Sequence, residues 1–289
     1  MKLRRRAGPG RRLAGLASVA ALMSTLMSAL MSTLLTGCAS PRQWALDQAA
    51  VALAAQGADN EDDLQLARDA AAYHLKLTES VLRQRPAHRA LATAVSAGFT
   101  QYAYAFVAFD ADRVQDSDAR AAKRLRERAA RLYGRARGHA MTALQTGRPG
   151  LLAVLREGST ASLAMLAPDE IGLAYWAAAA WAAQIALSTD RPDLVADLPA
   201  AVRLAGLAYA AEPAHGDGAL ASLMGTLEAA RPGGTRQRAQ AYFEQAQAAG
   251  GGRNASVFVA MAESLAQPAG DRSAFEALLR QAVTAADTR

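Results

Sequence analysis

Apolar and polar positions recur with helical spacing along most of this chain. The spacing predicts helices over about 62–82 and 87–109, with Pro86 ending the first of them. In a third helix, apolar residues three and four positions apart predict one buried stripe, formed by Ala122, Leu125, Ala129, Leu132, Ala136 and Ala140. From Pro168 onward, Pro and Gly bound further helical segments at about 169–188, 193–211, 216–230, 235–248, 254–266 and 272–286.

These later segments pair into three predicted helical hairpins. Two of the hairpins start at residues 216 and 254, which are 38 residues apart, close to the period of helical-repeat solenoids. Small residues fall where the helices of a tetratricopeptide hairpin touch, although Gly251 stands where that repeat has proline and Phe275 occupies a small-residue position. The chain is also rich in Ala and contains only two Ile, which argues against a sheet. The predicted fold class is all-α, with tetratricopeptide-like helical hairpin repeats (an α-solenoid) that offer an extended binding surface.

Charge is distributed unevenly around the third helix. Asp110, Asp112, Asp116 and Asp118 are predicted near its start, and Arg131, Arg135 and Arg137 toward its end, as the helix macrodipole favours. Basic residues fill much of its polar face, namely Lys123, Arg124, Arg126, Arg128, Arg131 and Arg135. This face is interpreted either as a solvated surface or as a docking face for an acidic partner or an anionic membrane.

The N-terminal region has the pattern of a lipoprotein export signal. Six basic residues precede an uncharged stretch from Leu13 to Leu35, and Leu35, Thr36, Gly37 and Cys38 then match the lipobox of bacterial lipoproteins. We therefore expect residues 1–37 to be a lipoprotein signal peptide and residues 38–289 to form a single all-helical domain behind a short lipid tether. The stretch is long enough to span a bilayer, so an uncleaved membrane anchor is the alternative.

Removal of this signal would change the charge and the chemistry of the chain. Residues 1–37 hold six of the 32 Lys and Arg and none of the 26 Asp and Glu, so the mature chain would be neutral. A neutral chain outside the cytoplasm is not expected to bind nucleic acid. Cys38 is the only cysteine, so its acylation leaves no disulfide and anchors the chain to a membrane. Ala39 stands where aspartate favours retention in the inner membrane, and this predicts the periplasmic face of the outer membrane.

An aromatic and Ala-rich segment supplies the candidate ligand-binding residues. Trp176 and Trp181 point about 140° apart on a helix, so the segment is apolar on all sides. Such a helix is either buried in the core or lines an apolar cavity. In the second case Tyr175, Trp176 and Trp181 would contact an apolar ligand and Gln184 would supply a polar contact.

The same segment carries a family resemblance. Gly172 to Trp176, four alanines, Trp181 and Ala186 to Ser188 resemble the T-component (TatT) family of tripartite ATP-independent periplasmic (TRAP) transporters. The runs 190–194 and 196–199 and the ending Phe275, Leu278 and Leu279 extend the resemblance over about 44–286. It implies an accessory periplasmic lipoprotein subunit that binds the solute-receptor component, possesses a passage for an apolar ligand and assembles as a trimer. A tetratricopeptide-like lipoprotein scaffold in outer-membrane insertion or secretion is the alternative.

The sequence offers little for catalysis. His74, His88, His139 and His215 lie far apart, and the chain has no zinc-binding His-Glu-x-x-His pair and no phosphate-binding glycine loop. We expect no catalytic residue, metal or cofactor, and therefore not an enzyme. Two carboxylates that folding brings together would escape such patterns, so a hydrolase of cell-wall sugars is the remaining enzymatic alternative.

Overall fold

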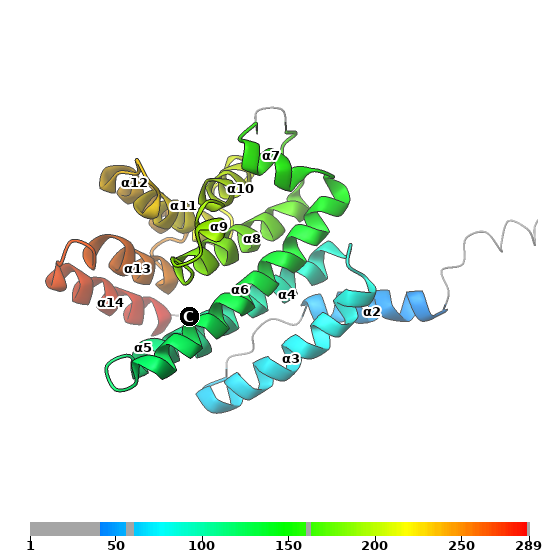
Figure 1. Cartoon of the computed structure of the whole chain (residues 1–289), viewed down its shortest axis with the longest axis horizontal. Helices are drawn as coiled ribbons and strands as arrows, with labels where there is room; N and C mark the ends of the chain where they lie inside the picture. Colours follow the sequence, from blue (N-terminus) through cyan, green and yellow to red (C-terminus); the bar gives the residue numbers. More distant parts are fainter. Residues whose placement is uncertain (1–40, 56–60, 160–162, 288–289) are drawn as a thin grey trace, which may run out of the picture. The chain divides into compact units, whose positions relative to one another are not determined.

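The computed structural model describes residues 41–55, 61–159 and 163–287. Cys38 and the predicted signal peptide, residues 1–37, lie outside these residues. The chain divides into two compact units, Met1–Asp47 and Gln48–Arg289. Every regular element in the described ranges is helical, which confirms the all-α prediction (Figure 1). The solenoid arrangement and the domain boundaries stay predictions.

The helices follow the predicted order closely. Their bounds are α2 Pro41–Ala55, α3 Leu64–Gln84, α4 Arg89–Tyr102, η1 Ala103–Ala108, α5 Phe109–Val114, α6 Ala119–Gly147, α7 Leu151–Glu157, α8 Pro168–Ala186, α9 Pro192–Val195, α10 Leu198–Ala211, α11 Ala219–Ala230, α12 Arg236–Ala249, α13 Ala255–Met261, η3 Ala262–Ala266 and α14 Arg272–Asp287. The two η elements are π-helical turns. Helices α2 and α7 were not predicted from the sequence.

Side-chain caps explain several of the helix starts. The Asp63 carboxylate accepts hydrogen bonds from the backbone N–H groups of Gln65 and Leu66, at the start of α3. His88 caps α4 through its Nδ1 atom, and Asn254 caps α13. These side chains satisfy backbone donors that a helix start leaves without partners. His88 therefore has a structural role that its residue type alone did not indicate.

The main core forms where helices distant in sequence pack side by side. The long α6 runs beside α4 and α8, and α10 packs on α8 (Figure 1). All six residues of the predicted stripe on α6 are buried or partly buried, which confirms that prediction. Helices α11 and α12 pack closely at Gly225, where an added Cβ atom would lie only 3.0 Å from the Phe243 ring. Small residues therefore set the spacing between helices in both regions.

The predicted charge order of the third helix was wrong in part. Asp110 and Asp112 belong to α5, because the preceding helix continues through the π-helical turn to Val114. Of these aspartates only Asp118 caps α6. Its carboxylate accepts a hydrogen bond from the Ala121 N–H at 2.8 Å. Arg137 lies near the middle of α6, because that helix extends to Gly147. The macrodipole therefore does not explain the placement of these residues.

A buried carboxylate joins α3 to α6. Glu79 is 1% exposed and accepts hydrogen bonds from the Arg135 guanidinium and, at 2.9 Å, from Lys76 Nζ. His139 Nε2 lies 2.9 Å from the same carboxylate. Burial would raise the pKa of Glu79, but the hydrogen bonds from Arg135, Lys76 and His139 lower it to about 2. Part of the basic surface predicted for this helix is therefore used inside the fold.

One described segment, Pro192–Ala211, has the length and apolar composition of a membrane span. Its part in α10 contributes Ala200, Ala201 and Leu204 to the main core, as a core helix does. Within it α9 ends and α10 begins near Asp197, because Pro199 lacks a backbone N–H and occupies the first turn of α10.

Candidate ligand-binding groove

A groove of about 300 Å³ lies where α8, η1, α11, α13 and η3 meet. Most of its exposed lining is apolar, and hydroxyl groups and one carboxylate supply the polar contacts. The lining consists of Tyr104, Tyr175, Ala219, Ser222, Leu223, Thr226, Ser256, Val259, Ala260 and Glu263. A concave apolar site with a few polar groups is the usual form of a small-molecule site.

The two π-helical turns bring the polar end of the groove together. Tyr104 lies in η1 and Glu263 in η3, and the Tyr104 hydroxyl donates a hydrogen bond to Glu263 Oε1 at 3.3 Å. In each turn the backbone bond reaches back five residues, from Phe109 N–H to the Tyr104 carbonyl and from Gln267 N–H to the Ala262 carbonyl. A π-helical turn re-aims the side chains around it and is frequent at functional sites.

The electrostatics of this end are dominated by Glu263. Glu263 is exposed to solvent, but desolvation by the surrounding protein and the negative charge of Asp112 raise its pKa, and the hydrogen bond from Tyr104 opposes them. Tyr104 is 51% exposed, and partial desolvation and the charge of Glu263 raise its pKa to about 12. Both tyrosines of the groove, Tyr104 and Tyr175, are therefore neutral hydrogen-bond donors at physiological pH.

Tyr175 is the one sequence-predicted candidate that lines the groove. Its ring packs edge-on against Trp176, with ring centroids 4.8 Å apart, and lies 5.9 Å from the His215 ring. His215 Nδ1 in turn lies 2.9 Å from Glu212 Oε2. Trp176 and His215 therefore both pack against the Tyr175 ring without lining the groove themselves.

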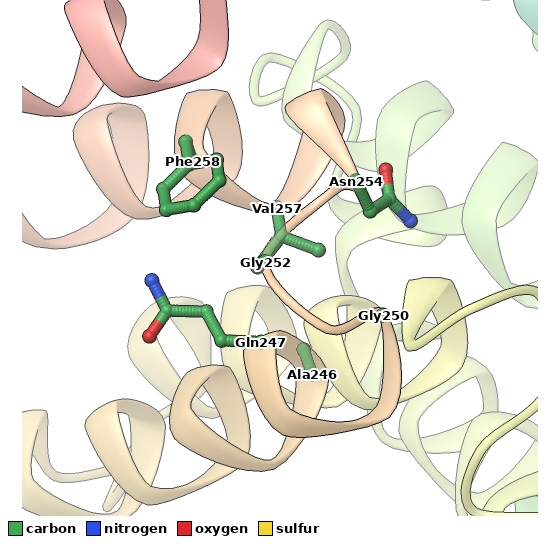
Figure 2. Close-up of a pocket in the computed structure, with 7 residues that line it drawn as sticks. All are labelled: Ala246, Gln247, Gly250, Gly252, Asn254, Val257 and Phe258. Atoms are coloured by element: carbon green, nitrogen blue, oxygen red, sulfur yellow. The ribbon is translucent and has the colours of Figure 1, made fainter. Parts of the chain in front are cut away.

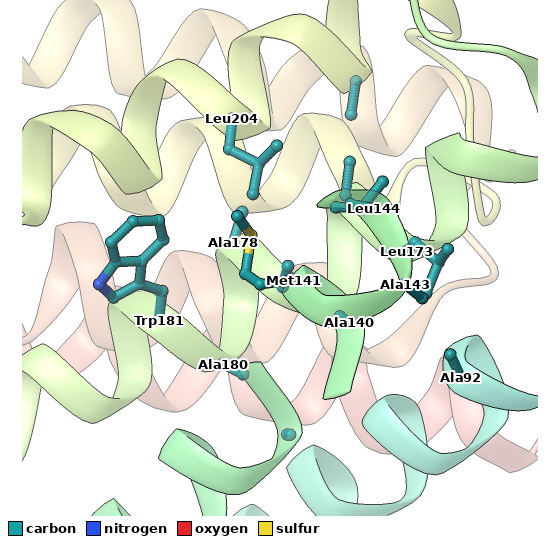
Figure 3. Close-up of a cluster of buried hydrophobic side chains, with 14 of the residues drawn as sticks. Ala92, Ala140, Met141, Ala143, Leu144, Leu173, Ala178, Ala180, Trp181 and Leu204 are labelled. Carbon is teal, nitrogen blue, oxygen red and sulfur yellow. The ribbon is translucent and has the colours of Figure 1, made fainter. Parts of the chain in front are cut away.

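Trp181 and Gln184 lie away from this groove. Trp181 is 1% exposed, and Figure 3 shows its ring among the buried side chains of the main core. The Arg137 guanidinium carbon lies 5.0 Å from the centre of the Trp181 ring. Gln184 packs against Gly134, whose Cβ, if present, would lie 2.6 Å from the Gln184 Nε2 atom. Ligand binding by the four predicted residues stays a prediction.

Tyr104 and Glu263 were not among the residues predicted from the sequence. Glu263 is a lone carboxylate in the apolar run 257–266, and that contrast is the signal that could have singled it out. Tyr104 lies among other aromatic residues and carries no comparable signal. The two are 159 positions apart, so no spacing rule could have paired them.

A second crevice lies at the turn between α12 and α13. Figure 2 shows Gly250 and Gly252 in this turn, with Gln247 and Phe258 on the helices beside it. The crevice leaves no volume for even a water molecule. Asn254 is occupied there as a cap and donates a hydrogen bond to the Asp217 carbonyl at 3.1 Å. We therefore interpret this crevice as part of the turn.

Within the described ranges, no group of three or more His, Cys, Asp or Glu side chains is arranged to hold a metal ion.

Comparison with known proteins identifies the family. The profile of the TRAP transporter T-component family matches residues 60–288. The chain belongs to this family. An uncharacterized protein of Treponema pallidum (strain Nichols) is 28% identical over 230 residues, which cover 77% of this chain and 71% of that protein. The T-component family comprises transporter subunits and is not a known enzyme family, so the chain is an accessory component of a TRAP transporter.

Proposed function

We propose that this T-component is a periplasmic lipoprotein that binds the solute receptor of its transporter and shelters an apolar ligand in the groove. The family match supports the transporter role and favours it over a scaffold for envelope assembly. The groove supports the ligand-binding part of the proposal, because it combines about 300 Å³ of space with a largely apolar lining. The trimeric state implied by the sequence resemblance belongs to the same proposal.

The proposed location is the periplasmic face of the outer membrane, with the chain anchored through acylated Cys38. The residues Leu35–Cys38 and the basic and apolar segments before them support this location. A mature lipoprotein cysteine with more than one acyl chain anchors stably, whereas one chain gives only marginal binding.

A Cys38→Ser variant tests the anchor. We expect the variant to incorporate no labelled palmitate and to lose stable membrane attachment, because serine has no thiol to acylate. Metabolic labelling followed by membrane fractionation measures both properties. The conservative variant Ala39→Ser is the control and is expected to be labelled like the unchanged protein. Equal labelling of the Cys38→Ser variant would contradict the proposal.

Native mass spectrometry tests the partner. We expect the full chain in detergent to form a complex with the solute receptor encoded beside the transporter's membrane subunits, and to be trimeric on its own. A receptor from an unrelated TRAP transporter serves as the control. A monomeric chain that forms no complex with its receptor would overturn the proposed function.

A further inference from the structure

The groove has a negative end without a positive partner. Glu263 accepts a hydrogen bond from Tyr104 and forms no ion pair with any described residue. The charge of the Asp112 carboxylate acts on Glu263 and is also negative. Asp112 is itself paired with Arg126 at 2.9 Å. None of the residues that line the groove is Lys, Arg or His. The groove therefore presents negative charge to whatever enters it.

The buried glutamates of the described chain each have a basic partner. Buried Glu79 and Glu170 are each paired with arginine side chains, and Glu228 accepts hydrogen bonds from Arg231 and Arg238. These pairings lower the pKa of each of the three carboxyl groups. Glu263 differs in that it is exposed to solvent in the groove, and desolvation and the charge of Asp112 raise its pKa with no cation to offset them. A carboxylate in this setting is stabilised by a positive charge brought from outside.

Aromatic rings lie at the same place. Tyr104 and Tyr175 both line the groove, and Tyr104 is the residue that holds Glu263. The face of an aromatic ring attracts a cation, and quaternary ammonium groups are often bound by such rings. The apolar residues Leu223, Val259 and Ala260 would contact the alkyl part of the same ligand.

We propose that the groove binds a small organic cation, an amine or a quaternary ammonium compound, with its charge beside Glu263, Tyr104 and Tyr175. This inference rests on the proposed function and deepens it: the apolar lining shelters the alkyl part of the ligand, and the ligand also carries a positive charge beside Glu263. An anionic ligand is disfavoured, because it would face Glu263 without a basic residue in the lining.

Two compounds of nearly equal shape test the proposal. Choline and 3,3-dimethyl-1-butanol differ only in that a charged nitrogen replaces a carbon atom. Binding of each to the full chain is measured by calorimetry in dodecyl maltoside and potassium phosphate, with a detergent blank and constant ionic strength. We expect choline to bind about tenfold more tightly than the alcohol.

Variants then assign the preference to Glu263. Glu263→Gln keeps the size and the hydrogen-bond acceptor and is expected to reduce the preference to within about threefold. Glu244→Gln changes an exposed carboxylate of α12 outside the groove and is expected to leave the preference unchanged. Ala260→Trp is expected to fill the groove and to weaken the binding of both compounds. Circular dichroism and thermal unfolding establish that each variant is folded.

The outcomes separate the two proposals. Equal binding of choline and the alcohol, or an unchanged preference in the Glu263→Gln variant, would overturn the cation proposal and leave the apolar groove intact. Failure of both compounds to bind the unchanged protein would overturn the groove as a ligand site, and with it this inference. Tighter binding of choline that depends on Glu263 and is blocked by Ala260→Trp supports it.

Discussion

Replacing Glu79 with glutamine is expected to lower the free energy of unfolding by about 3–5 kcal/mol. The side chain is buried and accepts hydrogen bonds from Arg135 and Lys76. Glutamine keeps the shape but removes the negative charge, so Arg135 loses its charge partner at the joint between α3 and α6. Chemical denaturation of the two proteins at pH 7 measures the difference. The control Glu127→Gln alters an exposed residue of α6 and is expected to stay within about 0.5 kcal/mol of the unchanged protein.

The effect of the Glu79→Gln substitution depends on pH in a defined direction. The pKa of Glu79 is lowered from its ordinary value of 4.5 to about 2 in the folded state. A lowered carboxyl pKa contributes stability that is fully present above the unfolded-state value and is lost as the pH falls toward the folded-state value. We therefore expect the stability difference between the two proteins to be constant above about pH 5 and to narrow between pH 4.5 and 2. A difference that widens in acid would contradict the assigned role of Glu79.

Replacing Trp181 with alanine is expected to lower the free energy of unfolding by about 3–5 kcal/mol. The side chain is among the largest that are fully buried, so its loss would leave a cavity in the main core. It would also remove the ring against which the Arg137 guanidinium packs. Because Trp181 does not line the groove, choline binding by the folded variant is expected to change less than twofold. Denaturation and calorimetry measure the two quantities separately.

Trp176→Ala is the matched comparison on the same helix. Trp176 is partly buried and packs against Tyr175, so its removal is expected to cost less stability and to weaken choline binding several-fold. If instead Trp181→Ala abolished binding in a folded protein while Trp176→Ala left it unchanged, the ligand site would lie at Trp181 and not in the groove.

Local signals in the sequence were sufficient for most helix positions. Pro86 and Pro168 lie beside helix boundaries, and the caps of α3, α6 and α13 are short polar side chains of the usual types. The predicted hairpin start at residue 216 was early by three residues. Gly216, Asp217 and Gly218 adopt positive φ angles there, so α11 begins only at Ala219.

The π-helical turns could not be predicted in the same way. Each one inserts a residue into a helix without changing its composition, so the apolar period gives no clear sign of it. The helix before α6 continues through the first turn to Val114 and therefore includes Asp110.

The sequence by itself determined the helical class, the likeness to the T-component family and the expectation of a lipid anchor at Cys38. These depend on composition, local spacing and short motifs, which folding does not rearrange. Only the tertiary structure decided which aromatic residue of α8 faces a groove, and which carboxylates are paired. Glu79 meets His139 across 60 positions and Glu263 meets Tyr104 across 159. Such contacts arise from the packing of whole helices, and no local pattern encodes them.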